Sequence, residues 1–103
     1  MGKLSQASEE AADELELYAM NDRDTYERSF MPAVKNLNAK FKKGTYDREK
    51  AIKLMGYVAE FAAKRYAKEM IGEPRTWSHH FNAATRRLAA RGFVSVYEAE
   101  YRR

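Results

Sequence analysis

The chain has 103 residues, of which 45% are hydrophobic and 33% are charged, and it contains no cysteine. This composition is too apolar for a disordered chain and excludes disulfide bonds and thiolate chemistry, so we expect a single domain over residues 1–103 in the cytoplasm. No apolar run approaches the about 20 residues of a transmembrane helix, so we expect no membrane partner.

Charge is distributed unevenly along the chain. Residues 1–30 carry three basic and eight acidic side chains, a net charge of −5, whereas residues 31–103 carry sixteen basic and seven acidic side chains, a net charge of +9. The basic segment favours an acidic partner, either nucleic acid or an acidic protein surface. The acidic segment can also serve as that partner within the chain.

The N-terminal acidic segment predicts a first helix. It should begin after Ser5 or Ser8, because serine is a good N-cap and the acids that follow suit the positive end of a helix dipole. Leu15 and Tyr18 supply its apolar side, and it should end near Asn21–Asp22.

A second helix is predicted to follow, capped by Asp22 or Asp24 and running to about Lys43. Its apolar positions recur every three or four residues. They are Tyr26, Phe30, Val34, Leu37 and Phe41. Pro32 lacks a backbone donor, so we expect a kink near residues 28–31 or a new start at Pro32. Gly44 should terminate this helix.

The third helix has the clearest pattern, with Thr45 as the expected cap and an end near Met70. One apolar stripe comprises Ile52, Met55, Ala59, Ala62, Tyr66 and Met70, and it is widened by Leu54, Val58 and Phe61. This helix should be the central, most buried one. The turn over residues 43–46 is short, so the second and third helices should pack as a long antiparallel hairpin.

The C-terminal third predicts short helices. Asn82 can cap a helix from Ala83 to about Arg91, with Gly92 closing it. The segment Ser95–Glu98 matches a capping box and suggests a last helix, although alternation over residues 93–100 leaves a strand open. We therefore expect an all-α fold: a long antiparallel helical hairpin flanked by an N-terminal acidic helix and C-terminal short helices.

Catalytic and metal-binding patterns are weak. His79 and His80, with Glu73 nearby, are the only imidazole cluster, and adjacent histidines do not converge on one ion without two further ligands. The acids of the first helix lack the pocket that separates the pKa values of catalytic carboxylates. No phosphate-binding loop, dinucleotide fingerprint or triad spacing is present. We expect no enzyme activity, no metal site and no cofactor.

Basic side chains are the strongest candidates for function. The candidate binding residues for nucleic acid or an acidic partner are Lys40, Lys42, Lys43, Tyr46, Arg48, Lys50, Lys53, Arg86, Arg87 and Arg91. They can track phosphates, or they can simply form a solvated face. Among the interleaved aromatic residues, Phe41 and Tyr66 fall on apolar stripes and are assigned to the core. Tyr46 and Tyr57 do not, and we expect them to be exposed.

The segment Thr85–Val94 also looks like the end of a winged-helix recognition helix that enters a wing strand. The usual preceding helix pair and a complete wing are missing from the pattern. A basic helix closed by glycine is equally ordinary.

A family resemblance lies in Leu15-Glu16-Leu17-Tyr18, Asn21-Asp22, Lys35-Asn36-Leu37, Gly44-Thr45-Tyr46-Asp47 and the segment from Ala62 to Glu69. Over about residues 15–70 the chain resembles small, uncharacterised helical proteins encoded in bacteriophage genomes. The resemblance implies a phage accessory protein that works in the bacterial host cytosol by binding host machinery or nucleic acid.

The sequence therefore favours a non-enzymatic accessory protein whose basic helical surface binds nucleic acid or an acidic host protein. The alternative is a helical, virion-associated or structural protein that self-associates as a homo-oligomer. Helical order alone leaves open whether the acidic first helix covers the basic turn or lies on the far side of the molecule.

Overall fold

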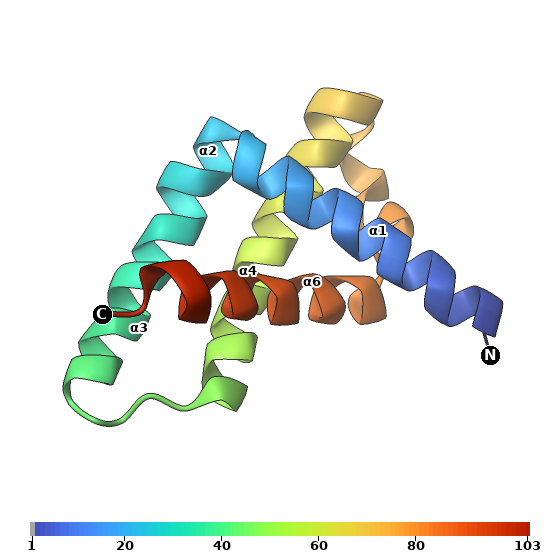
Figure 1. Ribbon diagram of the computed structural model, residues 1–103. Coiled ribbons are helices and arrows are strands. Elements are labelled where there is room, and N and C mark those ends of the chain that lie inside the picture. Colours follow the sequence, from blue (N-terminus) through green and yellow to red (C-terminus); the bar gives the residue numbers. More distant parts are fainter. Residues whose placement is uncertain (1) are drawn as a thin grey trace.

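The chain is a succession of helices, with no strand in the part that the structure covers (Figure 1). This computed structural model describes the backbone of residues 2–103 and the side chains of residues 8–103. The α-helices are α1 (Gly2–Asn21), α2 (Arg23–Thr25), α3 (Met31–Lys42), α4 (Arg48–Tyr66), α5 (Trp77–His80) and α6 (Ala83–Val96). Three single π-helical turns, Tyr26–Phe30, Ala67–Ile71 and Tyr97–Tyr101, and a 3₁₀ turn, Pro74–Thr76, extend or join them. The all-α prediction is confirmed.

The helices form two layers, with α1 and α6 lying across α3 and α4 (Figure 1). The molecule measures 40 × 32 × 19 Å, and its smallest dimension is about two helix diameters. The core lies between the layers and includes the fully buried side chains of Leu15, Phe30, Met55, Phe93 and Tyr97. Among the helices of residues 2–103, none has the length and apolar character needed to cross a bilayer.

The central position of α4 is confirmed, but the predicted antiparallel hairpin is not the main packing unit. A short turn does join α3 to α4, yet α4 packs chiefly on α6 and α1. Seven of its side chains are buried, namely Ala51, Ile52, Met55, Val58, Ala59, Ala62 and Ala63. Four of these are alanines, which let the crossing helices approach closely, so the C-terminal helix takes the place that the sequence assigned to α3.

Gly44 ends α3 as predicted, in the left-handed conformation with φ of 76°. The Gly44 amide donates to the Phe41 carbonyl at 3.1 Å and the Thr45 amide donates to the Lys40 carbonyl at 2.9 Å, the pair of bonds that closes a Schellman motif. Thr45 is therefore used at the end of α3, and it does not cap α4 as expected. Asp47 caps α4 instead, accepting a hydrogen bond from the Glu49 amide at 3.0 Å.

The helix is irregular where the sequence predicts a kink or a new start, and α3 begins one residue before Pro32. The π-helical turn Tyr26–Phe30 directly precedes α3, and Pro32 lies in the first turn of that helix. A proline interferes with the hydrogen bond and the carbonyl one turn before it. The wider π turn accommodates the proline and lets a continuous helical segment run from Arg23 to Lys42.

Two residues assigned to the core from their spacing are exposed. Met70 is 64% exposed because it lies in the π-helical turn Ala67–Ile71, where an extra residue per turn rotates it away from the stripe of α4. Phe41 is 41% exposed near the end of α3, and the guanidinium of Arg102 covers its ring at 5.0 Å. Phe61, expected to widen the stripe, is half-buried and lies outside the core cluster.

Residues 83–101 form one continuous helix, so the predicted break at Gly92 is wrong and the strand left open over residues 93–100 is not formed. Asn82 does cap α6, accepting from the Thr85 amide at 2.9 Å. The chain then stays helical through Gly92 and Ser95 to Tyr101. Gly92 packs closely against α1: a Cβ at this position would overlap the carboxylate of Glu16, so a larger residue requires that flexible side chain to move. The helix continues where the winged-helix reading requires a wing.

Buried hydrogen bonds attach the C-terminal turn to α3. Tyr97, which is fully buried, donates to Oδ1 of Asn38 at 2.6 Å. The Asn38 amide donates to the Tyr101 carbonyl at 3.0 Å, and the Tyr101 hydroxyl lies 2.9 Å from that of Tyr26. These contacts link residues more than 50 positions apart and hold the end of the C-terminal helix against α3 and the turn before it.

The corner between α1 and α2 is held by Asp22. Its side chain accepts from the Thr25 amide at 3.1 Å, which confirms Asp22 as the cap of the second helix. The same carboxylate accepts from Arg65 of α4 through Nε at 2.6 Å and Nη2 at 3.2 Å, a bidentate pair. Arg65 also contacts Asp24 at 3.1 Å. This geometry lowers the pKa of Asp22, chiefly through the hydrogen bonds from Arg65.

Removing either partner of this pair should destabilise the fold. We expect Asp22→Ala and Arg65→Met each to reduce the free energy of unfolding by about 2–4 kcal/mol. Arg65→Met leaves the partly buried carboxylate of Asp22 without its cation, whereas Asp22→Ala removes a helix cap and the bidentate pair and leaves Arg65 only its contacts with Asp24 and Glu69. In a double-mutant cycle measured by urea denaturation, the two losses should be less than additive by about 1–3 kcal/mol.

Arg23→Ala is the matched control, since Arg23 forms an ion pair with Glu27 at the surface and should contribute less than about 0.5 kcal/mol. Because the pKa of Asp22 is lowered in the folded state, the pair's stabilisation should be present above its ordinary pKa of 3.8 and should be lost below it. Strictly additive losses would show that the two side chains are not coupled.

Candidate functional site

Three of the candidate lysines lie together at the end of α3. Lys40, Lys42 and Lys43 are exposed, and none of them lies within ion-pair distance of a carboxylate in residues 8–103. They occupy the last turn of the helix, where cations complement the negative end of the dipole. These lysines and the following turn form a cationic corner that is open to solvent.

Tyr46 is half-buried against the core, so the prediction that it is exposed is wrong, whereas Arg48 stays exposed beside it. The Tyr46 hydroxyl donates to Glu98 at 2.8 Å, and its ring lies 5.8 Å from that of Tyr97. Burial of the ring, followed by the bond to Glu98, raises the pKa of Tyr46. Arg48 lies 3.6 Å from Glu98 and donates to Ser95 at 3.3 Å. Both residues join the start of α4 to the C-terminal helix.

Lys53 brings the two predicted basic clusters together. It lines a pocket of about 320 Å³ with Arg86 and Arg87 of α6, and Glu49 and Gly56 complete the wall on the α4 side. Lys50 lies near the start of α4, and its side chain is exposed. The candidate residues on α4 and α6 thus meet at Lys53, which the sequence alone does not indicate.

Arg86 is occupied by contacts within the protein. It donates to the Phe81 carbonyl at 2.6 Å and its guanidinium lies 4.7 Å from the ring centre of Trp77. These contacts fix the loop before α6 to the helix itself. Arg87 and Arg91 are exposed, and neither forms an ion pair with any side chain of residues 8–103.

The acidic first helix does not cover the cationic corner. It packs on α6 and α4, and Figure 1 shows it crossing the upper part of α4, at the end opposite the turn that joins α3 to α4. The charge separation in the sequence is therefore also a separation in space for Lys40, Lys42 and Lys43. Arg87 and Arg91 lie on the helix that α1 crosses, so its acids offset part of their field.

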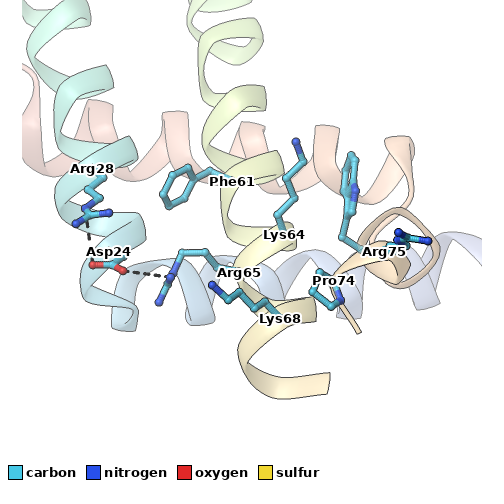
Figure 2. Close-up of a pocket in the computed structure, with 9 residues that line it drawn as sticks. Asp24, Arg28, Phe61, Lys64, Arg65, Lys68, Pro74 and Arg75 are labelled. Carbon is cyan, nitrogen blue, oxygen red and sulfur yellow. Dashed lines mark ion pairs between the residues drawn. The ribbon is translucent and has the colours of Figure 1, made fainter. Parts of the chain in front are cut away.

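A second basic pocket lies between α2, α4 and the turn before α5, and the sequence analysis did not identify it (Figure 2). Its volume is about 420 Å³. Five cations line it: Arg28, Lys64, Arg65, Lys68 and Arg75. Asp24 is the single acid in the wall, and Phe61, Pro74 and Trp77 supply apolar surface. The i, i+3 and i, i+4 spacing of Phe61, Lys64, Arg65 and Lys68 was the available sequence signal, but Arg28 and Arg75 come from distant segments.

The exposed histidines do not form a metal centre. His79 and His80 lie on the short helix α5 with exposed side chains, and no group of three or more potential ligands occurs among the residues whose side chains are described.

Of the two tyrosines predicted to be exposed, Tyr57 is 71% exposed on α4. Tyr66, assigned to the core, is half-buried between Tyr18 and Phe81 and donates a hydrogen bond to Glu14.

Glu16 is the one carboxylate with a strongly raised pKa. Partial burial against α6 at Gly92, followed by the nearby charge of Asp13, raises the pKa of Glu16 to about 7. No basic side chain within residues 8–103 pairs with it. Its position at a helix crossing, away from both basic pockets, indicates a packing role.

Comparisons of the chain with protein-family models, with curated proteins and with solved structures found no match.

The raised pKa of Glu16 predicts a specific pH dependence of stability. The folded state holds the proton more tightly than the unfolded chain, so ionising Glu16 should reduce the free energy of unfolding as the pH rises from about 4.5 to 7. Glu16→Gln should remove this loss. We expect the variant to match the wild type at pH 4 and to be more stable by on the order of 1 kcal/mol at pH 8, a value reduced for partial exposure.

Urea denaturation across this pH range provides the measurement. Glu10→Gln makes the same change of charge at an exposed position of α1 and serves as the control. Equal stabilisation by both variants at pH 8 would show that a general reduction of negative charge, and not the burial of Glu16, is responsible.

Proposed function

We propose that this protein is a non-enzymatic, phage-type accessory protein that binds nucleic acid through its cationic corner and the adjoining basic face of α4. The single observation that carries the proposal is the exposure of Lys40, Lys42 and Lys43 without intramolecular acidic partners, at a distance from the acidic helix. The resemblance of residues 15–70 to bacteriophage-encoded proteins supports the cellular context of a bacterial host cytosol.

Electrostatics favours nucleic acid over a small ligand at this surface. The corner is convex and carries its lysines on one helix end, an arrangement that suits a row of phosphates better than it suits a compact anion. Lys50 and Lys53 continue the positive charge along α4 towards Arg87. Contacts of this kind neutralise phosphates without reading bases, so binding should show little sequence preference and strong dependence on salt.

Affinity for a DNA duplex should fall steeply as salt is raised. If three to five of these cations contact phosphates, the logarithm of the binding constant should fall against the logarithm of salt concentration with a slope of about −3 to −4.5. We expect the double variant Lys42→Gln, Lys43→Gln to weaken binding and to make this slope less steep by about 2. Fluorescence anisotropy with a labelled duplex at several salt concentrations measures both effects.

The double variant Arg23→Gln, Lys35→Gln removes the same charge away from the corner and should leave the slope close to that of the wild type. Equal effects of the two double variants would show that binding depends on net charge and not on the position of the lysines. Absence of salt-sensitive binding to any nucleic acid, with capture of an acidic protein from nuclease-treated lysate, would favour the acidic-host-protein reading.

Self-association is the second candidate function, supported by exposed apolar side chains. Leu17, Tyr57 and Met70 are each more than 60% exposed, on α1 and on the α4 segment. Light scattering at low and high salt distinguishes this candidate, because an apolar interface should persist at high salt whereas phosphate binding should not. A monomer under both conditions would contradict it.

A further inference from the structure

We infer that the second basic pocket binds an unpaired nucleotide of a single strand, with the base against Phe61 and the adjoining phosphate near Lys68 and Arg75. This inference deepens the proposed nucleic-acid binding and rests on it for the identity of the polymer. It assigns a role to a region of the molecule, between α2 and the C-terminal half of α4, that the cationic corner does not include (Figure 2).

Phe61 is the feature that separates this pocket from a merely basic surface. It is a large aromatic side chain that is only half-buried, and it belongs neither to the buried core cluster nor to the partly buried residues packed against it. It lines the pocket, and Figure 2 shows its ring between Arg28 and Lys64. An aromatic ring that contributes little to the core yet lies among cations can stack on a planar group that carries negative charge.

The cations around Phe61 differ in how far they are already neutralised. Arg65 is committed to Asp22 and Asp24, and Arg28 lies 4.0 Å from Asp24. Lys64 lies 3.5 Å from Glu60. Lys68 and Arg75 are exposed and have no carboxylate partner among residues 8–103. The unneutralised charge of the pocket therefore belongs to Lys68 and Arg75, which lie on either side of Pro74 in Figure 2.

The combination of a half-buried ring that lines the pocket and two cations without carboxylate partners among residues 8–103 matches a nucleotide unit. The base supplies a planar face, and the phosphate supplies the negative charge. A pocket of about 420 Å³ has room for one such unit. A base that is paired within a duplex cannot leave the stack without loss of stacking and pairing energy, so the recessed position of Phe61 favours an unpaired strand.

The surface beyond the pocket allows the strand to continue. A smaller pocket of about 280 Å³ lies between α3 and α4 and shares Arg28 with the first. Tyr57 lines it and is 71% exposed. Leu54, Tyr57, Phe61, Lys64 and Lys68 recur every three or four residues and so share one side of the α4 segment. A neighbouring nucleotide can therefore meet a second aromatic ring.

Trp77 provides a direct measurement of this site, because it is the only tryptophan of the chain and it lines the pocket. We expect a thymidine 12-mer to change its fluorescence, excited at 295 nm, in a saturable manner at low salt. Phe61→Ala should weaken this binding about tenfold, and Phe61→Tyr should retain it, because a stacked base depends on an aromatic ring. Urea denaturation of both variants checks that they remain folded.

The charge contribution is tested with matched double variants. Lys68→Gln, Arg75→Gln should weaken the Trp77 response and should reduce its salt dependence by the equivalent of about two phosphate contacts. Lys42→Gln, Lys43→Gln removes equal charge from the cationic corner and should change the Trp77 titration less. Thymidine monophosphate and a 12-base-pair duplex distinguish the source: a response to the monophosphate at similar concentrations indicates a free nucleotide, and a response to the 12-mer alone indicates a strand.

Failure of this inference is distinguishable from failure of the proposed function. Binding by Phe61→Ala equal to that of the wild type, or an equal Trp77 response to the duplex, would overturn the pocket while leaving the cationic corner untouched. A Trp77 response to thymidine monophosphate without salt-sensitive binding of any polymer would overturn the proposed nucleic-acid binding and the inference that the pocket binds a single strand. It would still support a site for a free nucleotide. No response to any of these probes would overturn the pocket outright.

Discussion

The ion pair between Asp22 and Arg65 fixes the relation between the two helical layers. Asp22 ends α1, caps α2 and binds α4 through one carboxylate, so three elements meet at a single side chain. Because the angle at this corner determines where α1 crosses α4, it also determines how α6 is covered. The guanidinium of Arg65 also forms part of the wall of the second basic pocket. A structural interaction thus supports the shape of the pocket for which we propose nucleotide binding, without contributing free charge to it.

Sequence patterns predicted the helical class, the central place of α4 and the caps Asp22 and Asn82, because these depend on local hydrogen bonding and on apolar spacing. They failed where tertiary contacts override local signals. Gly92 is typical of a helix end, but it lies inside α6, where Glu16 of α1 packs against it. The π-helical turn Ala67–Ile71 rotates Met70 out of the apolar stripe, and no propensity of single residues announces such a turn.

The exposed lysines of the candidate surface were predictable from the sequence, whereas the contacts that other candidate residues make within the fold were not. Lys40, Lys42 and Lys43 follow each other in a last helical turn, where exposure is expected. The contacts of Tyr46 and Arg48 within the protein depend on Glu98, which is about 50 residues away in the sequence. The second basic pocket is formed by α4 and by the segments that contain Arg28 and Arg75. These three segments are distant in the sequence and come together only in the packed fold. Spacing within one helix therefore identifies half of such a site at most.

The position of α1 affects how the molecule orients in an electric field before it contacts a partner. A chain with a negative first helix at one end and free lysines at the other has a permanent electric dipole. In the field of a polyanion such a molecule rotates so that its lysines lead, within a Debye length of about 10 Å at 0.1 M salt. At low ionic strength the same asymmetry lets opposite ends of two copies attract, so weak head-to-tail chains in dilute buffer should dissolve on addition of salt.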